Sequence, residues 1–234
     1  MRGRALGVIG AGLLAGCAAS RPCPIEVAAA NARAQTHFAT PQALVQELVD
    51  ACRIDNGAAL VAMVGQDNAA LVRSGDPAAD RAQCARFVVA TEQQTRLEAV
   101  GADRMVLVVG SDEHRMPIPL VMDAQGWRLD TDAGAAEIRR RTVGANELRA
   151  IATCRAAAKG AALPASASGY AYRTLRGPGA TLVAVPLQYR RTGVMTFVVA
   201  QGTVYEKDLG ADTSALAASL TGAAPDASWR VVAN

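Results

Sequence analysis

The chain has 234 residues, a formal net charge of +3 and 51% hydrophobic residues, but only nine aromatic rings. This length allows one large or two small domains with a hydrophobic core, and the charged fraction of 19% argues against a disordered chain. The small net charge and the few rings argue against nucleic acid as a partner, and two histidines exclude a histidine-cluster metal site.

The first sixteen residues have the pattern of a secretory signal peptide. Arg2 and Arg4 precede the uncharged stretch 5–16. A helix of that length measures about 18 Å, which is too short for a hydrocarbon core of about 30 Å. The sequence Leu-Ala-Gly-Cys at 14–17 resembles the bacterial lipobox, in which the cysteine is lipidated and becomes the first residue after cleavage. We therefore expect lipidation at Cys17; the alternative is a plain signal peptide with an incidental cysteine.

These features predict an exported protein, lipid-anchored to a bacterial membrane through Cys17, with its body in the periplasm or on the cell surface. Several acyl chains on one residue give firmer anchoring than the marginal binding of a single chain. Residues 17–37 lack a sustained apolar pattern and read as a tether. Four cysteines remain beyond the anchor, and none has the CxxC spacing of a redox or zinc motif: Cys23, Cys52, Cys84 and Cys154.

Residues 38–135 predict helices followed by antiparallel strands. Thr40 and Pro41 start a helix whose apolar face carries Leu44, Leu48 and Cys52. After a short apolar piece at 60–64, a further helix is expected over 80–98. Strands are then expected at 105–109, 118–122 and 127–129, the first two separated by the polar loop 110–117.

Residues 136–234 predict one helix and then a second set of strands. The helix begins after Asp130 and continues through Cys154. Gln201 and Gly202 are placed to turn the last hairpin. Strands are expected at 170–175, 181–187, 194–200 and 203–206, followed by a short helix at 214–220 and an extended tail at 229–232. The chain is therefore expected to be α+β, in two halves.

One loop concentrates side chains that could do chemistry. Ser111, Asp112, Glu113 and His114 bring together a hydroxyl, two carboxylates and an imidazole, so a general acid–base role is a candidate. A solvated hairpin loop is the commoner explanation of such a sequence, and the chain has no G-x-S-x-G nucleophile elbow. No cofactor or metal is expected.

Several segments together resemble the bacterial family known as domain of unknown function 2950. They are FATPQALVQELVDAC (38–52), SGDPAADRAQCARFV (74–88), PIPLVMDAQGWRLDTDAG (117–134), NELRAIATC (146–154) and GVMTFVVAQGTVYEKDLGADT (193–213). The resemblance implies an exported or lipid-anchored envelope protein, and it carries over no catalytic residue. Family members usually have a long polar insertion before the Gly-Tyr strand, of which only about ten residues, 159–168, remain here.

Two looser likenesses concern the fold. Residues 38–135 resemble the nuclear-transport-factor-two-like cone, with helices on a curved antiparallel sheet. Residues 136–234 resemble the helix plus antiparallel β-meander of type IV pilin heads. Both are analogies of fold, which do not establish function.

The sequence allows two states for Cys52 and Cys84. Cys52 continues the apolar face of its helix, and Cys84 lies three residues before Phe87 on the matching face of the helix over 80–98. Packed helices lie about 8–10 Å apart, whereas a disulfide requires Cα atoms within about 7 Å, so the register decides. We predict a Cys52–Cys84 disulfide; the alternative is two buried free thiols. The family pattern has small residues other than cysteine at both positions, which makes the two a matched addition.

Two classes of function remain. The first is a non-catalytic binding or assembly module at a membrane surface, whose envelope protein partner the sequence does not identify. The second is a small-molecule-binding or hydrolytic domain with a pocket in the cone-like half and Asp112, Glu113 or His114 at its mouth. A deep apolar pocket with a buried, perturbed carboxylate or imidazole would favour the enzyme.

Overall fold

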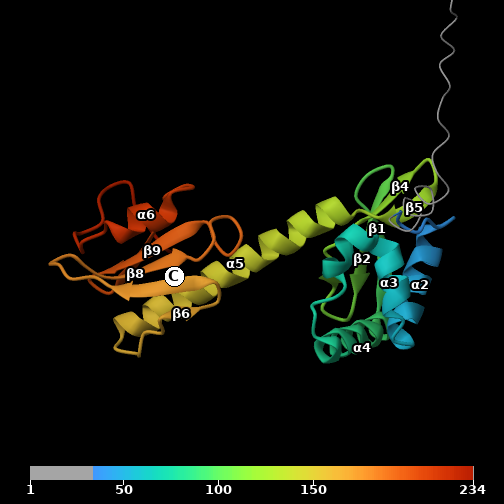
Figure 1. Cartoon of the computed structure of the whole chain (residues 1–234), viewed down its shortest axis with the longest axis horizontal. Coiled ribbons are helices and arrows are strands. Elements are labelled where there is room, and N and C mark those ends of the chain that lie inside the picture. Colours follow the sequence, from blue (N-terminus) through green and yellow to red (C-terminus); the bar gives the residue numbers. More distant parts are fainter. Residues whose placement is uncertain (1–33, 234) are drawn as a thin grey trace, which may run out of the picture.

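The computed structural model describes residues 34–233. It contains two antiparallel sheets, each with its own helices, and one long helix, α5 (Thr131–Ala158), that joins them (Figure 1). The expected signal peptide 1–16, the lipidation site Cys17 and Cys23 lie outside the described residues. Gln35 donates side-chain hydrogen bonds to the carbonyl oxygens of Met63 and Leu129, so the folded body includes the end of the expected tether.

The first half begins with a set of helices. The side chain of Thr40 accepts a hydrogen bond from the amide of Ala43 and caps the first helix, as predicted. Asp76 caps the last of them through the amides of Ala78 and Ala79. The helices are α2 (Pro41–Arg53), α3 (Gly57–Val64), the 3₁₀-helix η1 (Gln66–Leu71) and α4 (Pro77–Gln93).

The first sheet packs against these helices. Its path is β1-β2-β4-β5, and β3 also pairs with β2. Fully buried side chains from both layers form the core, among them Leu44 and Val64 from the helices and Leu107 and Leu120 from the strands. The strands are β1 (Thr95–Ala99), β2 (Arg104–Val109), β3 (His114–Arg115), β4 (Leu120–Asp123) and β5 (Gly126–Leu129).

The predicted helix over 80–98 is wrong at its C-terminal end. The helix stops at Gln93, and the next residues form β1, in which Thr95 is the register partner of Val109 in β2. A five-residue antiparallel pairing with a buried strand outweighs the helical preference of Arg, Leu, Glu and Ala in this stretch, because tertiary pairing overrides local propensity. The expected polar loop 110–117 likewise contains the short strand β3.

Helix α5 is shared between the two halves. Asp130 caps it by accepting a hydrogen bond from the amide of Ala133, and Gly134 lies directly against the side chain of Ile118. Further along, Ala150 and Cys154 are fully buried against the second sheet. The first turns of α5 therefore belong to the first core and its last turns to the second.

The second sheet is a six-stranded antiparallel meander in the order β11-β10-β9-β8-β7-β6. One face packs on α5, and the other is covered by α6 (Thr213–Ala218) and the segment around Trp229 (Figure 1). Gln201 and Gly202, both with positive φ, turn the hairpin between β9 and β10 as predicted. The strands are β6 (Ser166–Ala167), β7 (Tyr170–Thr174), β8 (Ala180–Pro186), β9 (Met195–Ala200), β10 (Thr203–Asp208) and β11 (Arg230–Val231).

The predicted α+β class is confirmed: helices with a five-stranded antiparallel sheet are followed by a long helix and a six-stranded meander. Within residues 34–233, every helix is too short or too polar to cross a bilayer.

Candidate functional site

An apolar cavity lies between the helices and the sheet of the first half. Its volume is about 370 Å³. Side chains of α2, of the strands and of α5 form its walls, and Cys84 and Phe87 of α4 also face it. Its apolar lining residues include Leu44, Leu48, Leu60, Leu107, Ile118, Leu120, Leu129 and Ile138.

A few polar side chains also line the cavity. Asp80 accepts hydrogen bonds from the hydroxyl and the amide of Ser74, and these bonds, with the nearby Arg73 charge, hold the pKa of Asp80 below its usual value. Arg73, which is exposed, forms no ion pair with the described residues. Gln83 adds an amide. The cavity thus has an apolar interior and a small set of polar groups, which is the usual composition of a small-molecule site.

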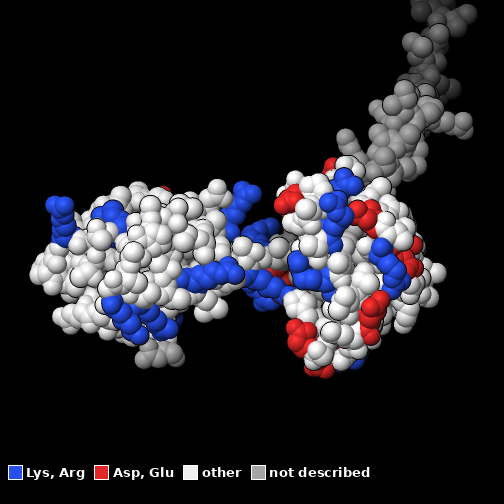
Figure 2. Space-filling model, turned by 90° about the horizontal axis from the view of Figure 1, so that it is seen from below, with Lys and Arg blue, Asp and Glu red and all other residues white. Residues whose placement is uncertain are grey.

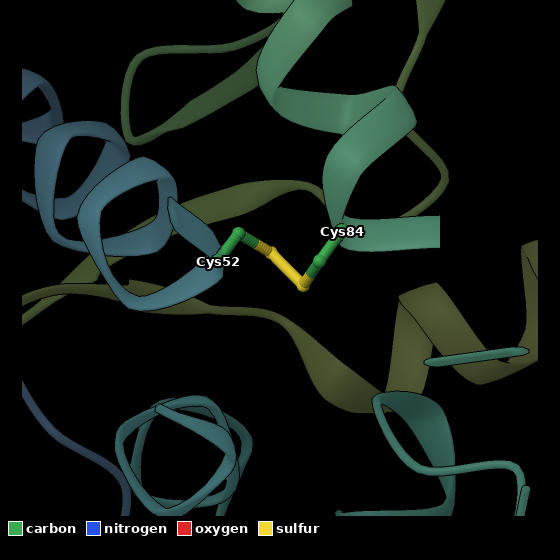
Figure 3. Close-up of a disulfide and its surroundings, with 2 residues drawn as sticks. All are labelled: Cys52 and Cys84. Carbon is green, nitrogen blue, oxygen red and sulfur yellow. A yellow bond between two sulfur atoms is a disulfide. The ribbon is translucent and has the colours of Figure 1, made fainter. Parts of the chain in front are cut away.

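A disulfide forms part of the wall. Cys52, at the end of α2, is bonded to Cys84 of α4, with the two Cα atoms 5.0 Å apart (Figure 3). Both cysteines line the cavity. The predicted pairing is therefore present, and the register of α2 on α4 satisfies the distance that a bridge requires.

Helix α4 is packed more loosely than its neighbours. None of its seventeen residues is buried, whereas α2 buries five residues, among them Leu44 and Val49. The contacts of α4 with the core are made by partly buried side chains such as Phe87 and Ala90. Because little apolar burial holds this helix, we expect the disulfide to α2 to be a large part of its attachment.

The predicted acid–base loop lies elsewhere. Ser111, Asp112, Glu113 and His114 are all exposed, and none of them lines the cavity. Glu113 forms a surface ion pair with Arg96. The four side chains therefore lie together on one exposed segment, with His114 at the start of β3, but have no enclosed space in which to act on a substrate.

Comparison with protein families identifies the chain's relatives. The family described as "Protein of unknown function (DUF2950)" matches residues 35–161 and 157–232, which together cover most of the chain. The chain belongs to this family. Comparison with curated proteins and with solved structures gave no match.

The segment NELRAIATC (146–154) attaches α5 to the start of β9 through hydrogen bonds. One carboxylate oxygen of Glu147 accepts hydrogen bonds from the amides of Val194 and Met195, at 2.8 and 3.0 Å. The side chain of Asn146 donates to the carbonyl of Thr192. These residues fix the helix on the second sheet. The sequence does not reveal these hydrogen bonds, because the bonded residues lie more than forty positions apart.

A second DUF2950 feature is the glycine that opens GVMTFVVAQG. The Tyr170 hydroxyl donates a hydrogen bond to the carbonyl of Met195, and a Cβ at Gly193 would overlap that hydroxyl. Burial raises the pKa of Tyr170 far above its usual value, so the phenol stays protonated as a donor. The glycine is therefore a requirement of packing rather than of catalysis.

The remaining cysteine and the carboxylates give no sign of a metal site within residues 34–233. No group of three or more His, Cys, Asp or Glu side chains there is arranged to hold an ion. Cys154 is a free, buried thiol, and burial raises its pKa to about 12. A thiol with so high a pKa is a poor nucleophile at neutral pH.

Proposed function

We propose that this protein is an exported bacterial lipoprotein, anchored to a membrane through Cys17, whose body is a non-catalytic binding module. The basic start, the short apolar stretch and the lipobox-like sequence at 14–17 support the anchor. Membership of DUF2950, whose members have no assigned activity, is compatible with this role. As an alternative, the body assembles with another envelope protein.

The observation that carries the binding role is the apolar cavity of the first half, which supports the small-molecule-binding alternative over an assembly role. Its volume of about 370 Å³ falls within the range of about 300–1,000 Å³ that is usual for ligand sites. If a methylene takes up about as much space as a water molecule, about 30 Å³, the cavity has room for roughly a dozen carbon atoms. The ligand is thus a small apolar molecule or a single-chain amphiphile, with its polar end at Arg73, Ser74 and Gln83.

Two finer features of the fold belong to this proposal. Residues 38–135 resemble the cone of nuclear-transport-factor-two-like domains, with helices on a curved antiparallel sheet, and the second half resembles a type IV pilin head. The two matched ranges meet at 157–161, which supports a shortened insertion at 159–168.

A hydrolytic function has less support. Asp112, Glu113 and His114 are exposed and stand apart from the cavity, and the polar side chains that do line it include one carboxylate, Asp80, whose pKa is lowered rather than raised. A general acid at neutral pH requires the opposite shift.

The anchor is tested by metabolic labelling of bacteria with an alkyne fatty acid. The wild-type chain should be labelled, and the Cys17→Ala variant should stay unlabelled and accumulate as the uncleaved precursor. Equal labelling of both chains contradicts the anchor at Cys17.

The cavity is tested by titration of the full chain with a neutral, apolar fluorescent probe such as N-phenyl-1-naphthylamine. Ala70 is exposed and lines the cavity, so Ala70→Trp should block it without entering the core and lower the probe affinity at least ten-fold. Ala79→Trp, on an exposed position of α4 that does not line the cavity, is the matched control and should bind like the wild type. Equal binding by all three chains contradicts the proposed site.

A further inference from the structure

The two halves of the chain differ in charge. Residues 34–141 hold 11 basic and 15 acidic residues, whereas residues 142–233 hold 9 basic and 5 acidic residues. The first half therefore carries a net charge of −4 and the second a net charge of +4. In Figure 2, acidic side chains gather on the half that contains α2 and α4, and the other half shows basic groups with hardly any acidic ones.

The halves also differ in how far their basic side chains are neutralised. In the first half most arginines form ion pairs, such as Arg104 with Asp130 and Arg128 with Asp123, at 2.7 and 2.8 Å. Of the nine basic residues in 142–233, Arg230 alone forms one, with Glu206. The positive charge of the second half is therefore available to a partner.

Part of this free charge lies on the outer side of α5. Ala150 and Cys154 face the sheet, so the helical period puts Leu148 and Ala152 on the opposite side, together with Lys159, which caps the end of α5. Arg149 and Arg155 flank them. Arg155 is half-buried and also donates a hydrogen bond to the carbonyl of Ala233. Leu148 is 70% exposed. We call this set the basic face of α5: Leu148, Arg149, Ala152, Arg155 and Lys159.

No free carboxylate opposes this face from its own helix. Glu147 is the one acidic residue of α5 after Arg141, and its carboxylate binds the amides of Val194 and Met195. The view of Figure 2 is from below Figure 1, the side on which α5 lies under the second sheet. The surface of the second half there shows basic groups and hardly any acidic ones (Figure 2). Leu148 adds an exposed apolar side chain to the basic groups of this face, a composition suited to the interface of a membrane.

We propose that the basic face of α5 lies on the anionic phospholipid headgroups of the membrane that holds the anchor. This inference rests on the proposed lipidation of Cys17. The 17 residue-to-residue steps from Cys17 to Ala34 can span at most about 60 Å, so an anchored body stays close to the bilayer. Anionic headgroups attract the second half and repel the first, which fixes the orientation of the body. Each basic residue near such a surface strengthens binding about five-fold.

The test uses the full, lipidated chain purified from bacterial envelopes and reconstituted in vesicles. A chain carrying Cys23→Ser and Ala152→Cys accepts a fluorescent dye at position 152, because Cys154 is buried. Quenching of the dye by a headgroup-attached quencher reports how close the face is to the bilayer. Quenching should be strong in vesicles that contain phosphatidylglycerol and weak in phosphatidylcholine alone, and salt should reverse it.

Neutralisation of the face separates this proposal from the anchor. Arg149→Gln, Arg155→Gln and Lys159→Gln together should lower the ratio of docked to undocked chains at least ten-fold. The matched control changes three exposed arginines of the first half, Arg53, Arg81 and Arg86, to Gln and should not weaken quenching, because a more negative first half is repelled further.

The outcomes distinguish the two proposals. Flotation of the vesicles in a density gradient reports whether the chain is anchored. If the chain floats with both kinds of vesicle but is quenched equally in both, docking through the basic face is refuted and the anchor is left intact. Chains that fail to float with phosphatidylcholine refute the anchor. Binding of the unanchored chain to phosphatidylglycerol vesicles, with loss in the triple variant, would then still support the face. Salt-sensitive self-association without vesicles, lost in the same variant, would overturn the proposal. It would show that the partner of this face is a second copy of the chain and not the membrane.

Discussion

Removal of the disulfide between Cys52 and Cys84 is the sharpest test of how α4 is held over the cavity. The bridge joins residues 32 apart in the sequence and closes a loop of 33 residues. On the chain-entropy relation, a crosslink of this size stabilises the folded state by about 3.7 kcal/mol. Since α4 buries no residue of its own, little apolar packing remains to hold the helix when the bridge is removed.

The assay is urea unfolding of the oxidised wild-type chain and of the double variant Cys52→Ala/Cys84→Ala. The variant should lose about 3 to 4 kcal/mol in free energy of unfolding, or roughly 7–15 °C in Tm for a body of this size. It should also bind the apolar probe more weakly, because both cysteines line the cavity. Dithiothreitol should lower the wild type to the level of the variant and leave the variant unchanged. A loss below about 1 kcal/mol refutes the inference that the bridge holds α4.

Four further predictions concern the rest of the body. Alanine at positions 112–114 together should shift Tm by only a few degrees, since exposed substitutions usually stay within about 0.5 kcal/mol each, and a large loss would show that the loop carries structure. Glu147→Ala should cost about 2–3 kcal/mol in urea unfolding because two amides lose a charged acceptor, and Glu147→Gln should cost less. Gly193→Ala should displace the Tyr170 hydroxyl and cost about 1–3 kcal/mol; an unchanged midpoint would contradict the close packing. Iodoacetamide at pH 8 should leave Cys154 unmodified in the folded chain, given its pKa of about 12, and modify it in urea.

The sequence predicts the elements whose signals are local. Thr40 with Pro41 marks the start of α2, and Gln201 with Gly202 marks the last hairpin, because caps and tight turns depend on a few adjacent residues. The pairing of Cys52 with Cys84 could also be predicted, since periodicity puts both on apolar faces, although only the register in three dimensions decides between a bridge and two thiols.

The features that the sequence does not predict depend on distant partners. The strand β1 forms because β2, several residues further on, offers it a complete antiparallel pairing. The cavity is bounded by residues from α2, α4, α5 and the first sheet, so no single stretch of sequence carries its signature. The division of charge does not show in the net charge of +3, because the charges of −4 and +4 on the two halves cancel and the +3 comes from residues 1–33.

Native mass spectrometry of the chain purified from bacterial envelopes tests the central claim most directly. The proposed function predicts that the wild type carries one small apolar or amphiphilic molecule in addition to the acyl chains on Cys17, and that Ala70→Trp, which blocks the cavity, lacks that molecule. The Ala79→Trp control should retain it. A wild-type chain whose mass is accounted for by protein and anchor alone, or an equal extra mass in the blocked variant, would contradict a ligand in the cavity.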